Sequence, residues 1–347
     1  MAWNWLAIAI PFMALTPDNA NTIKIGLVRL LDAAPYILAG ELGYYQEAGL
    51  KVQLSWELGW ATIKHKIAYG ELDAAHALAP LPLSISIGYE VAARPCEALM
   101  VTSRIGNAIT LSNRIRSRGV NTADDFRAEV RSMRGQRLYK LGVVSLDSCH
   151  YFLLRQWLTS IRLDPSRDVK IVVIPPGQAV RNLRAGTLDG YCVGEPWNSL
   201  AVREGLGWTV SMSNDLAPNH PEKVLLALKS KITERPQQFE ALVKAVQKGC
   251  AYCSDSENIV RVSRQMRRAQ ILGSTAQGVE KILRGEYDRG AGLGVLPEPV
   301  IDFCSNGSTE ISAADVAWIT LCAKQAEWSG VPTQAIMDAS SSAYRSA

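Results

Sequence analysis

The chain contains one phrase twice: Gly70-Glu71-Leu72-Asp73-Ala74-Ala75-His76 and, further on, Gly186-Thr187-Leu188-Asp189-Gly190-Tyr191-Cys192. Each copy closes an amphipathic, helix-like stretch and opens a short apolar run. Each is soon followed by proline, at Pro80 and Pro196. A repeat of this kind predicts two similar lobes.

The segments that precede each copy repeat as well. A β-rich run, an amphipathic stretch and a second β-rich run lead into the first copy at 22–29, 33–47 and 51–56, and into the second at 138–144, 151–161 and 169–174. Strands that alternate with helices of this length predict βαβ units with parallel pairing. The sequence therefore predicts an α/β protein of two lobes, and a cleft between domains is where small ligands usually bind.

Length and composition agree with this prediction. A chain of 347 residues corresponds to about two domains at roughly 150 residues each. It is 48% hydrophobic and 20% charged, which is typical of a globular protein. The net charge of +4 is mild, and basic residues alternate with acidic ones, so we expect no direct nucleic-acid binding. The densest basic run, 261–268, is interpreted as a solvated helix face.

The first 21 residues are interpreted as an N-terminal apolar segment that resembles a degenerate signal peptide. The run 3–15 has the right length, but no Lys or Arg precedes it and no A-x-A cleavage site follows it. Pro11 and Asp18 interrupt it, so a membrane span is not expected. Whether residues 1–21 are cleaved stays open.

The seven cysteines are odd in number and scattered, which indicates reduced thiols rather than a disulfide framework. Cys250 and Cys253 form a CxxC pair inside a predicted helix at 237–252. Without a second Cys or His pair nearby, neither a metal nor a redox role is expected for them.

Catalytic motifs are missing from the sequence. It contains no Walker A loop, no HExxH and no GxSxG, and the glycines at 290, 292 and 294 lack the context of a dinucleotide fingerprint. No cofactor, catalytic residue or metal ligand is therefore predicted.

Three histidines are candidate ligand contacts: His76, His150 and His220. His150 is favoured because it follows the first strand of the second lobe and begins a helix, where backbone N–H groups attract anions. Trp60 follows the second predicted strand of the first lobe. The segment 175–178 follows the second predicted strand of the second lobe. Ligands in open α/β sheets lie beyond the carboxyl ends of strands, so these loops should face the cleft.

Several stretches carry a family resemblance. The chain resembles the nitrate- and bicarbonate-binding proteins of ABC-type uptake systems and the related cytoplasmic nitrate sensors of bacterial nitrate-assimilation operons. The matching stretches are 32–35, 60–62, 70–80, 106–110, 163–165, 173–176, Cys192-Val193-Gly194-Glu195-Pro196-Trp197-Asn198 and His220-Pro221-Glu222-Lys223. They occur in the family's order, and the last two are the most specific.

The resemblance implies a type II periplasmic-binding-protein fold with an anion held between the lobes. Lobe 1 would comprise 22–105 plus 222–347, and lobe 2 would comprise 106–221. The family's anion contacts fall on Trp60, Asn107, His150 and Lys223. Two positions depart from the family: Asn107 replaces a Gln, which is closer to the sensor branch, and Cys149 replaces a Thr.

The residue types favour one kind of anion. Nitrate has acceptor oxygens and no proton, so it needs donors and positive charge, which Lys223, His150 and the Asn107 amide supply. Bicarbonate carries a hydroxyl group and needs an acceptor. The resemblance implies that the bicarbonate branch of the family provides this acceptor as a carboxylate at the position of Lys223. The lysine therefore favours nitrate or nitrite, which residue types alone do not separate.

Two functional classes remain open at this point. One is the receptor of an ABC-type nitrate importer, with a permease as partner and a periplasmic or membrane-associated location. The other is a cytoplasmic nitrate sensor whose partner is an RNA-binding antiterminator. A third class, an enzyme like those of thiamine-pyrimidine synthesis, would need a cysteine-rich or metal-binding segment that the sequence lacks, so an enzyme is not expected.

Overall fold

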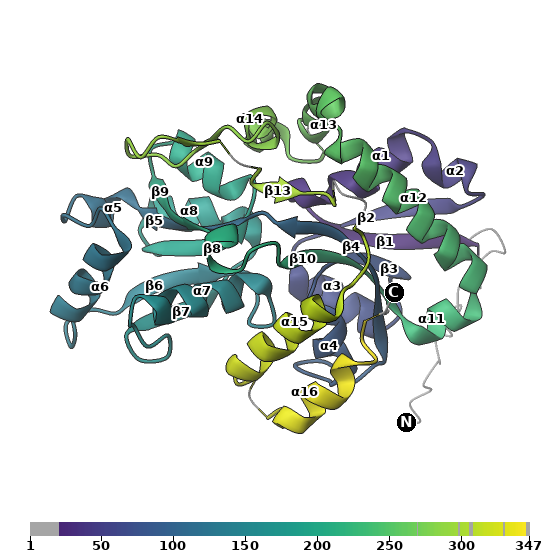
Figure 1. Cartoon of the computed structure of the whole chain (residues 1–347), viewed down its shortest axis with the longest axis horizontal. Coiled ribbons are helices and arrows are strands. Elements are labelled where there is room, and N and C mark those ends of the chain that lie inside the picture. The colour runs from purple at the N-terminus through teal and green to yellow at the C-terminus, as the bar shows by residue number, and fades with distance from the viewer. Residues whose placement is uncertain (1–20, 269, 298, 305–307, 329, 345–347) are drawn as a thin grey trace, which may run out of the picture.

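The computed structural model describes residues 21–347 apart from 269, 298, 305–307, 329 and 345–347. Within that part of the chain, one sheet has six strands in the order β13-β4-β10-β3-β1-β2, and a second has five in the order β7-β6-β8-β5-β9. We call the first sheet with its helices lobe 1 and the second with its helices lobe 2. They lie side by side in Figure 1, lobe 2 at the left and lobe 1 at the right.

The strands of lobe 1 are β1 (Thr22–Val28), β2 (Lys51–Glu57), β3 (Ala74–Leu78), β4 (Cys96–Ile105), β10 (Pro221–Leu228) and β13 (Ile301–Asp302). Those of lobe 2 are β5 (Asn107–Ser112), β6 (Tyr139–Val143), β7 (Val169–Val173), β8 (Gly190–Gly194) and β9 (Gly207–Met212). Strands β11 (Tyr287–Asp288) and β12 (Val295–Leu296) form a separate small ribbon.

The helices before β10 are η1 (Leu31–Ala33), α1 (Ala34–Glu41), α2 (Tyr44–Glu47), α3 (Trp60–Ala68), α4 (Leu81–Ser86), α5 (Asn113–Arg116), α6 (Ala123–Ser132), α7 (Cys149–Ser160), η2 (Pro176–Gln178), α8 (Ala179–Ala185), α9 (Trp197–Arg203) and α10 (Ser213–Leu216). Those after it are α11 (Lys229–Glu234), α12 (Pro236–Ser254), η3 (Ser256–Asn258), α13 (Ile259–Met266), η4 (Gly273–Ala276), α14 (Val279–Leu283), α15 (Ala313–Gln325) and α16 (Thr333–Ser340).

The two sheets share one pairing pattern. In lobe 1, β1 pairs in parallel with β2 and β3, and β3 pairs antiparallel with β10. In lobe 2, β6 pairs in parallel with β7 and β8, and β8 pairs antiparallel with β5. The predicted α/β class and the parallel βαβ units are therefore confirmed.

The repeated phrase has the same backbone conformation and the same kind of hydrogen bond in both lobes. Gly70 and Gly186 take left-handed backbone angles, with φ of 75° and 71°, which glycine adopts without steric cost. Asp73 then accepts a hydrogen bond from the N–H of Lys24 at 2.9 Å, and Asp189 accepts one from the N–H of Lys140 at 2.8 Å. Each aspartate thus ties the strand that it starts to the neighbouring parallel strand.

The stretch 33–47, predicted as one amphipathic segment, is divided in the structure. Helix α1 ends at Glu41 and α2 begins at Tyr44, because Gly43 between them has a left-handed φ of 80°. The helix predicted at 151–161 starts two residues earlier, since the Ser148 hydroxyl caps it by accepting from the N–H of Tyr151 at 3.1 Å.

The chain crosses between the sheets twice. On the first crossing, β4 ends at Ile105 and β5 begins at Asn107, with Gly106 between them. On the second, the chain leaves β9, passes α10 and enters β10. Ile105 has a φ of 50°, which is unfavourable for a β-branched residue and costs on the order of 1–3 kcal/mol. Because the sheets change here, we propose lobe limits at 105/106 and 221/222.

The C-terminal helices contact both lobes, and Figure 1 shows α15 and α16 below the junction of the sheets. Arg104 of β4 forms a buried ion pair with Asp315 of α15 at 2.7 Å. In lobe 2, the Leu146 carbonyl accepts a hydrogen bond from the indole of Trp328 at 3.2 Å. The expectation for residues 1–21 falls almost wholly outside the described residues, and no described helix is long and apolar enough to cross a membrane.

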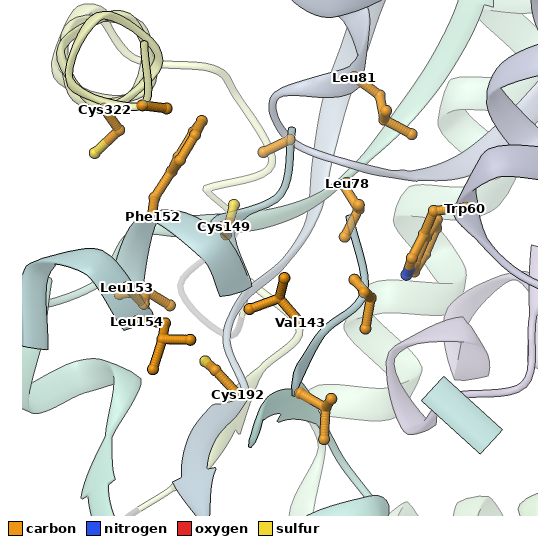
Figure 2. Packing of buried hydrophobic residues seen from close by; sticks show 14 of the residues in the cluster. Trp60, Leu78, Leu81, Val143, Cys149, Phe152, Leu153, Leu154, Cys192 and Cys322 are labelled. Carbon is orange, nitrogen blue, oxygen red and sulfur yellow. The ribbon is translucent and has the colours of Figure 1, made fainter. Parts of the chain in front are cut away.

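One buried apolar cluster extends through both lobes. It contains Trp60 and Leu78 of lobe 1 together with Val143 and Phe152 of lobe 2, as Figure 2 shows. A second cluster lies on the other face of the lobe 1 sheet, among α1, α12 and α13. The first cluster encloses the polar residues described next.

Candidate functional site

The four residues predicted to contact an anion are all buried, and each is at most 1% exposed. Trp60 is the first residue of α3, Asn107 the first of β5, His150 the second of α7 and Lys223 the third of β10. They come from different lobes and lie where the sheets meet, close to both crossings. Reaching them from solvent therefore requires the lobes to separate.

Glu222 is the residue that connects these side chains. Its Oε1 is 2.7 Å from the Lys223 Nζ and 3.8 Å from the His150 Nε2, and its Oε2 accepts a hydrogen bond from the Asn107 amide at 2.5 Å. The Lys223 Nζ also lies 5.4 Å from the centre of the Trp60 ring, within range of a cation–π contact. The structure thus brings all four predicted residues together.

Lys223 lies between two carboxylates, since Asp32 Oδ2 is also 2.7 Å from its Nζ. Burial alone would lower the pKa of Lys223, but the two carboxylates outweigh it and raise that pKa. Burial would likewise raise the pKa of Asp32, but Lys223 and His76 hold it well below its usual value. Burial dominates at Glu222 and raises its pKa above the usual value despite Lys223.

The three candidate histidines all join this region. The His76 Nε2 lies 3.0 Å from Asp32 Oδ1, and the His76 ring packs against Trp60. Burial lowers the pKa of His76 and of His150, and it lowers the pKa of His220 to about 4. Near neutral pH all three are therefore uncharged, and the charge of the cluster rests on Lys223, Asp32 and Glu222.

Several buried polar atoms of the cluster have no hydrogen-bond partner among the described residues. They include the Trp60 indole nitrogen, both ring nitrogens of His150 and the Asn107 side-chain oxygen. Lys223 has three N–H groups for two carboxylates, and the Asn107 amide has two for one. Buried polar groups are nearly always hydrogen-bonded. The donors here are the Trp60 indole N–H, the one N–H of neutral His150 and the spare N–H groups of Lys223 and Asn107, and they indicate a small ligand with acceptor oxygens. The Asn107 oxygen is itself an acceptor and is not counted among these donors.

Cys149, His220 and Glu222 place potential metal-ligand atoms within 4.8 Å of one another. Both Glu222 oxygens already accept bonds, from Lys223 and Asn107. Burial also raises the pKa of the Cys149 thiol well above its usual value. A cation would have to displace a lysine and a proton from a dry site, so we assign no metal to this group.

A second buried polar group, which we call the interlobe latch, joins Lys64 and Ser84 of lobe 1 to Asp147 of lobe 2. Asp147 Oδ2 lies 2.6 Å from both the Lys64 Nζ and the Ser84 hydroxyl. Asp147 is 0% and Lys64 4% exposed. No pattern in the sequence predicts this contact, because Lys64 and Lys66 fit the polar face of an ordinary amphipathic helix.

The phrase from Val193 to Asn198, which carries part of the family resemblance, makes several structural hydrogen bonds. The Asn198 amide donates to the Val193 carbonyl at 2.8 Å, and its oxygen accepts from the Thr110 hydroxyl at 2.9 Å. The Glu195 carbonyl accepts from the N–H of Leu31 at 2.9 Å, a further bond between the lobes. These bonds of Asn198 and Glu195 shape the junction, while the buried indole nitrogen of Trp197 has no hydrogen-bond partner among the described residues.

The architecture defines the class of this protein. Two α/β lobes joined by two crossings, with a polar cluster at their junction, form a periplasmic-binding-protein fold, as predicted. The chain belongs to the NMT1-like family, whose model matches residues 16–266.

Individual proteins agree with that assignment. The periplasmic nitrate-binding protein NrtA from Synechocystis PCC 6803 superposes with a TM-score of 0.86 over 94% of this chain and 86% of that one, at 24% identity. In Synechocystis sp., the nitrate import ATP-binding protein NrtC is 37% identical over 77% of this chain and 40% of that protein. The bicarbonate transport ATP-binding protein CmpC is 38% identical over 73% of this chain and 38% of that protein. The chain thus spans about two fifths of the length of these two relatives.

Proposed function

We propose that this protein is a receptor for nitrate or nitrite that binds the anion at the lobe junction and closes around it. The observation that carries the proposal is the set of donors described above, which meet in one enclosed place: Lys223, Asn107, His150 and Trp60. A planar monoanion with acceptor oxygens complements such a set. The likeness to NrtA and NrtC supports the same ligand.

Closure follows from where the contacts originate. Trp60 and Lys223 belong to lobe 1, and Asn107 and His150 to lobe 2. An anion held by both sets stabilises the closed arrangement, because it gains contacts there that an open form does not offer. The interlobe latch adds a ligand-independent contribution to the same state.

For its biological role, we propose the substrate-binding component of an ABC-type nitrate importer, which would deliver the anion to a permease. The alternative is a sensor that signals anion binding to a regulatory partner such as an antiterminator. The similarity to components of nitrate and bicarbonate transport supports the first. We further infer a non-catalytic role, since the neutral histidines and the paired lysine around the junction bind rather than transform a stable oxyanion.

The test is isothermal titration of the purified protein with nitrate, nitrite, bicarbonate and sulfate. We expect nitrate or nitrite to bind with a micromolar Kd. Lys223→Ala should weaken binding by about 100-fold or more, because it removes the only full positive charge of the cluster and leaves buried carboxylates unpaired. Lys244→Ala, which alters an exposed lysine of α12, is the matched control and should bind normally.

Trp60→Phe gives a second, milder variant, because it keeps an aromatic ring and removes only the indole N–H. We expect it to weaken binding roughly tenfold, the usual value of a hydrogen bond to a charged group. Tight binding of bicarbonate with none of nitrate would contradict the choice of anion. An unchanged Kd in Lys223→Ala would contradict the site itself.

A further inference from the structure

The charged groups at the lobe junction do not balance. Lys223 is the one cation among the described residues of the cluster, and it faces the two carboxylates of Asp32 and Glu222 at 2.7 Å each. With both carboxylates ionised, the cluster carries an excess negative charge before any anion arrives. All three residues are at most 4% exposed, so solvent screens them weakly.

A bound monoanion would add a second negative charge to this enclosed space. Transferring unpaired charge out of water is costly, and proteins usually avoid it by changing the protonation of a nearby group. The site therefore either binds the anion very weakly or takes up a proton together with the anion.

Glu222 is the group whose bonds the anion would disturb most. Its two oxygens accept from Lys223 and from Asn107, and these are two of the donors assigned to the anion. An anion that accepts hydrogen bonds from the same lysine and amide weakens their bonds to the Glu222 carboxylate. The negative charge of the anion also repels that carboxylate. Both effects favour the acid form of Glu222, which could then donate an O–H to the anion.

The other titratable groups around Glu222 do not relieve the imbalance. Asp32 stays ionised, because Lys223 and His76 hold its pKa well below the usual value. The neutral groups that face Glu222 come from several elements: His150 and Cys149 on α7, Cys192 on β8, and His220 before β10. His150 and His220, each 3.8 Å from one oxygen of Glu222, are the competing acceptors of a proton.

We infer that the protein takes up one proton together with each monoanion, and that the carboxylate of Glu222 receives it. The effective ligand is thus an oxyanion plus a proton. This inference rests on the proposed function and specifies how that site selects its ligand. The proton passes from a solvent acid to a Glu222 oxygen, no other bond changes, and the cluster keeps its overall charge.

The sign of the pH effect follows directly. Because the complex holds one more proton than the free protein, affinity falls as pH rises, by about tenfold per pH unit while a whole proton is taken up. The fall begins above the pKa of Glu222 in the free protein, which is already raised. The fall in affinity ends above the pKa that Glu222 has in the complex, because that pKa is higher than the one in the free protein.

The experiment is calorimetric titration of the unmodified protein with nitrate at one neutral pH in two buffers, phosphate and Tris, whose ionisation enthalpies differ. One proton taken up per nitrate makes the observed enthalpies differ by the difference between the two buffers. Repeating the titration between about pH 6 and about pH 8 should give the fall in affinity. Equal enthalpies and a constant Kd would overturn the inference while leaving nitrate binding intact. No nitrate binding at any pH would overturn the proposed function as well.

Two isosteric variants then identify the acceptor. Glu222→Gln should bind nitrate without proton uptake and with little pH dependence. The matched control is Glu195→Gln: that carboxyl is also buried with a raised pKa, but it accepts from the N–H of Ser199 instead. The control should keep the uptake of one proton. Uptake that persists in Glu222→Gln and vanishes in His150→Gln would overturn the assignment to Glu222. If Glu222→Gln does not fold, the two-buffer titration of the unmodified protein still decides whether a proton is bound.

Discussion

The two lobes use one scaffold to carry different chemistry. The repeated phrase begins β3 and β8 in the same way, with Asp73 and Asp189 bonded to the neighbouring strands. It ends differently, because His76 of lobe 1 contacts Asp32 whereas the equivalent residue of lobe 2 is the buried, neutral Cys192. The comparison teaches that the repeat specifies the fold, while departures from it specify the ligand.

The same division holds across the junction. Lobe 1 supplies every charged group of the cluster: Asp32, Glu222 and Lys223. Lobe 2 supplies the neutral donors, Asn107 and His150. An anion therefore meets its charge partner in one lobe and its neutral hydrogen-bond partners in the other.

The largest expected effect comes from breaking the only buried ion pair that we find between the lobes within the described residues. Asp147→Asn leaves the buried Lys64 ammonium with only the exposed Glu90 carboxylate, 3.9 Å away, and losing the close partner of a buried pair costs about 3–5 kcal/mol. We expect the free energy of unfolding in urea to fall by this order and nitrate affinity to fall with it, because the closed state is destabilised.

The control for Asp147→Asn is Glu47→Gln, which removes one partner of an exposed ion pair with Lys248 in lobe 1. Exposed pairs contribute at most about 1 kcal/mol, so neither stability nor binding should change much. Equal losses of stability and nitrate affinity in the two variants would show that the interlobe latch stabilises the closed state no more than an exposed ion pair does.

A smaller effect tests how alike the two scaffolds are. Gly26 of β1 and Gly142 of β6 lie under leucines of the repeated phrase, and an added Cβ would approach Leu72 to 2.5 Å and Leu188 to 3.0 Å. Overpacking of this kind costs about 1–3 kcal/mol. We expect both alanine variants to lower the melting temperature, Gly26→Ala more than Gly142→Ala. The reverse order would contradict the packing described here.

The smallest effect should be the same in both lobes. Asp73→Asn and Asp189→Asn each keep an acceptor oxygen for the neighbouring strand but lose a charge that pairs with an arginine, Arg235 or Arg137. We expect each to cost about 1 kcal/mol in urea unfolding, since a neutral hydrogen bond is weaker than a charge-assisted one. The double variant should show the sum of the two losses, because the sites are far apart and independent. Nitrate affinity should not change in any of the three.

The sequence predicted the fold well because the relevant signals are local. The repeat, the alternation of strands and helices, and the glycines at Gly70 and Gly186 are all readable within short windows. The break between α1 and α2 depends on the backbone of Gly43, which lies inside the single amphipathic stretch that the sequence predicts at 33–47. Strand ends placed Trp60 and His150 near the junction, and the resemblance supplied Asn107 and Lys223.

The sequence could not provide the electrostatics of the site. The sequence predicts Lys223 as the positive charge that meets the anion, and the structure adds that Asp32, nearly two hundred residues earlier, and Glu222 lie at equal distances from its ammonium group. The latch likewise joins Lys64 to an aspartate of the other lobe. Such pairs depend on how two lobes dock, which no local pattern encodes.

The position of the crossings has a mechanical consequence. Asn107 follows the strained turn at Ile105 and Lys223 follows the return, so both residues lie next to the segments that connect the two sheets. The outermost strands, β2 and β7, lie at the edges of the two sheets. Their loops meet where a Cβ on Gly59 would be 3.9 Å from Pro175. Gly59 directly precedes Trp60, so an opening that separates these loops also withdraws Trp60 from lobe 2. The two loops are therefore a sensitive place to attach a pair of optical reporters of opening.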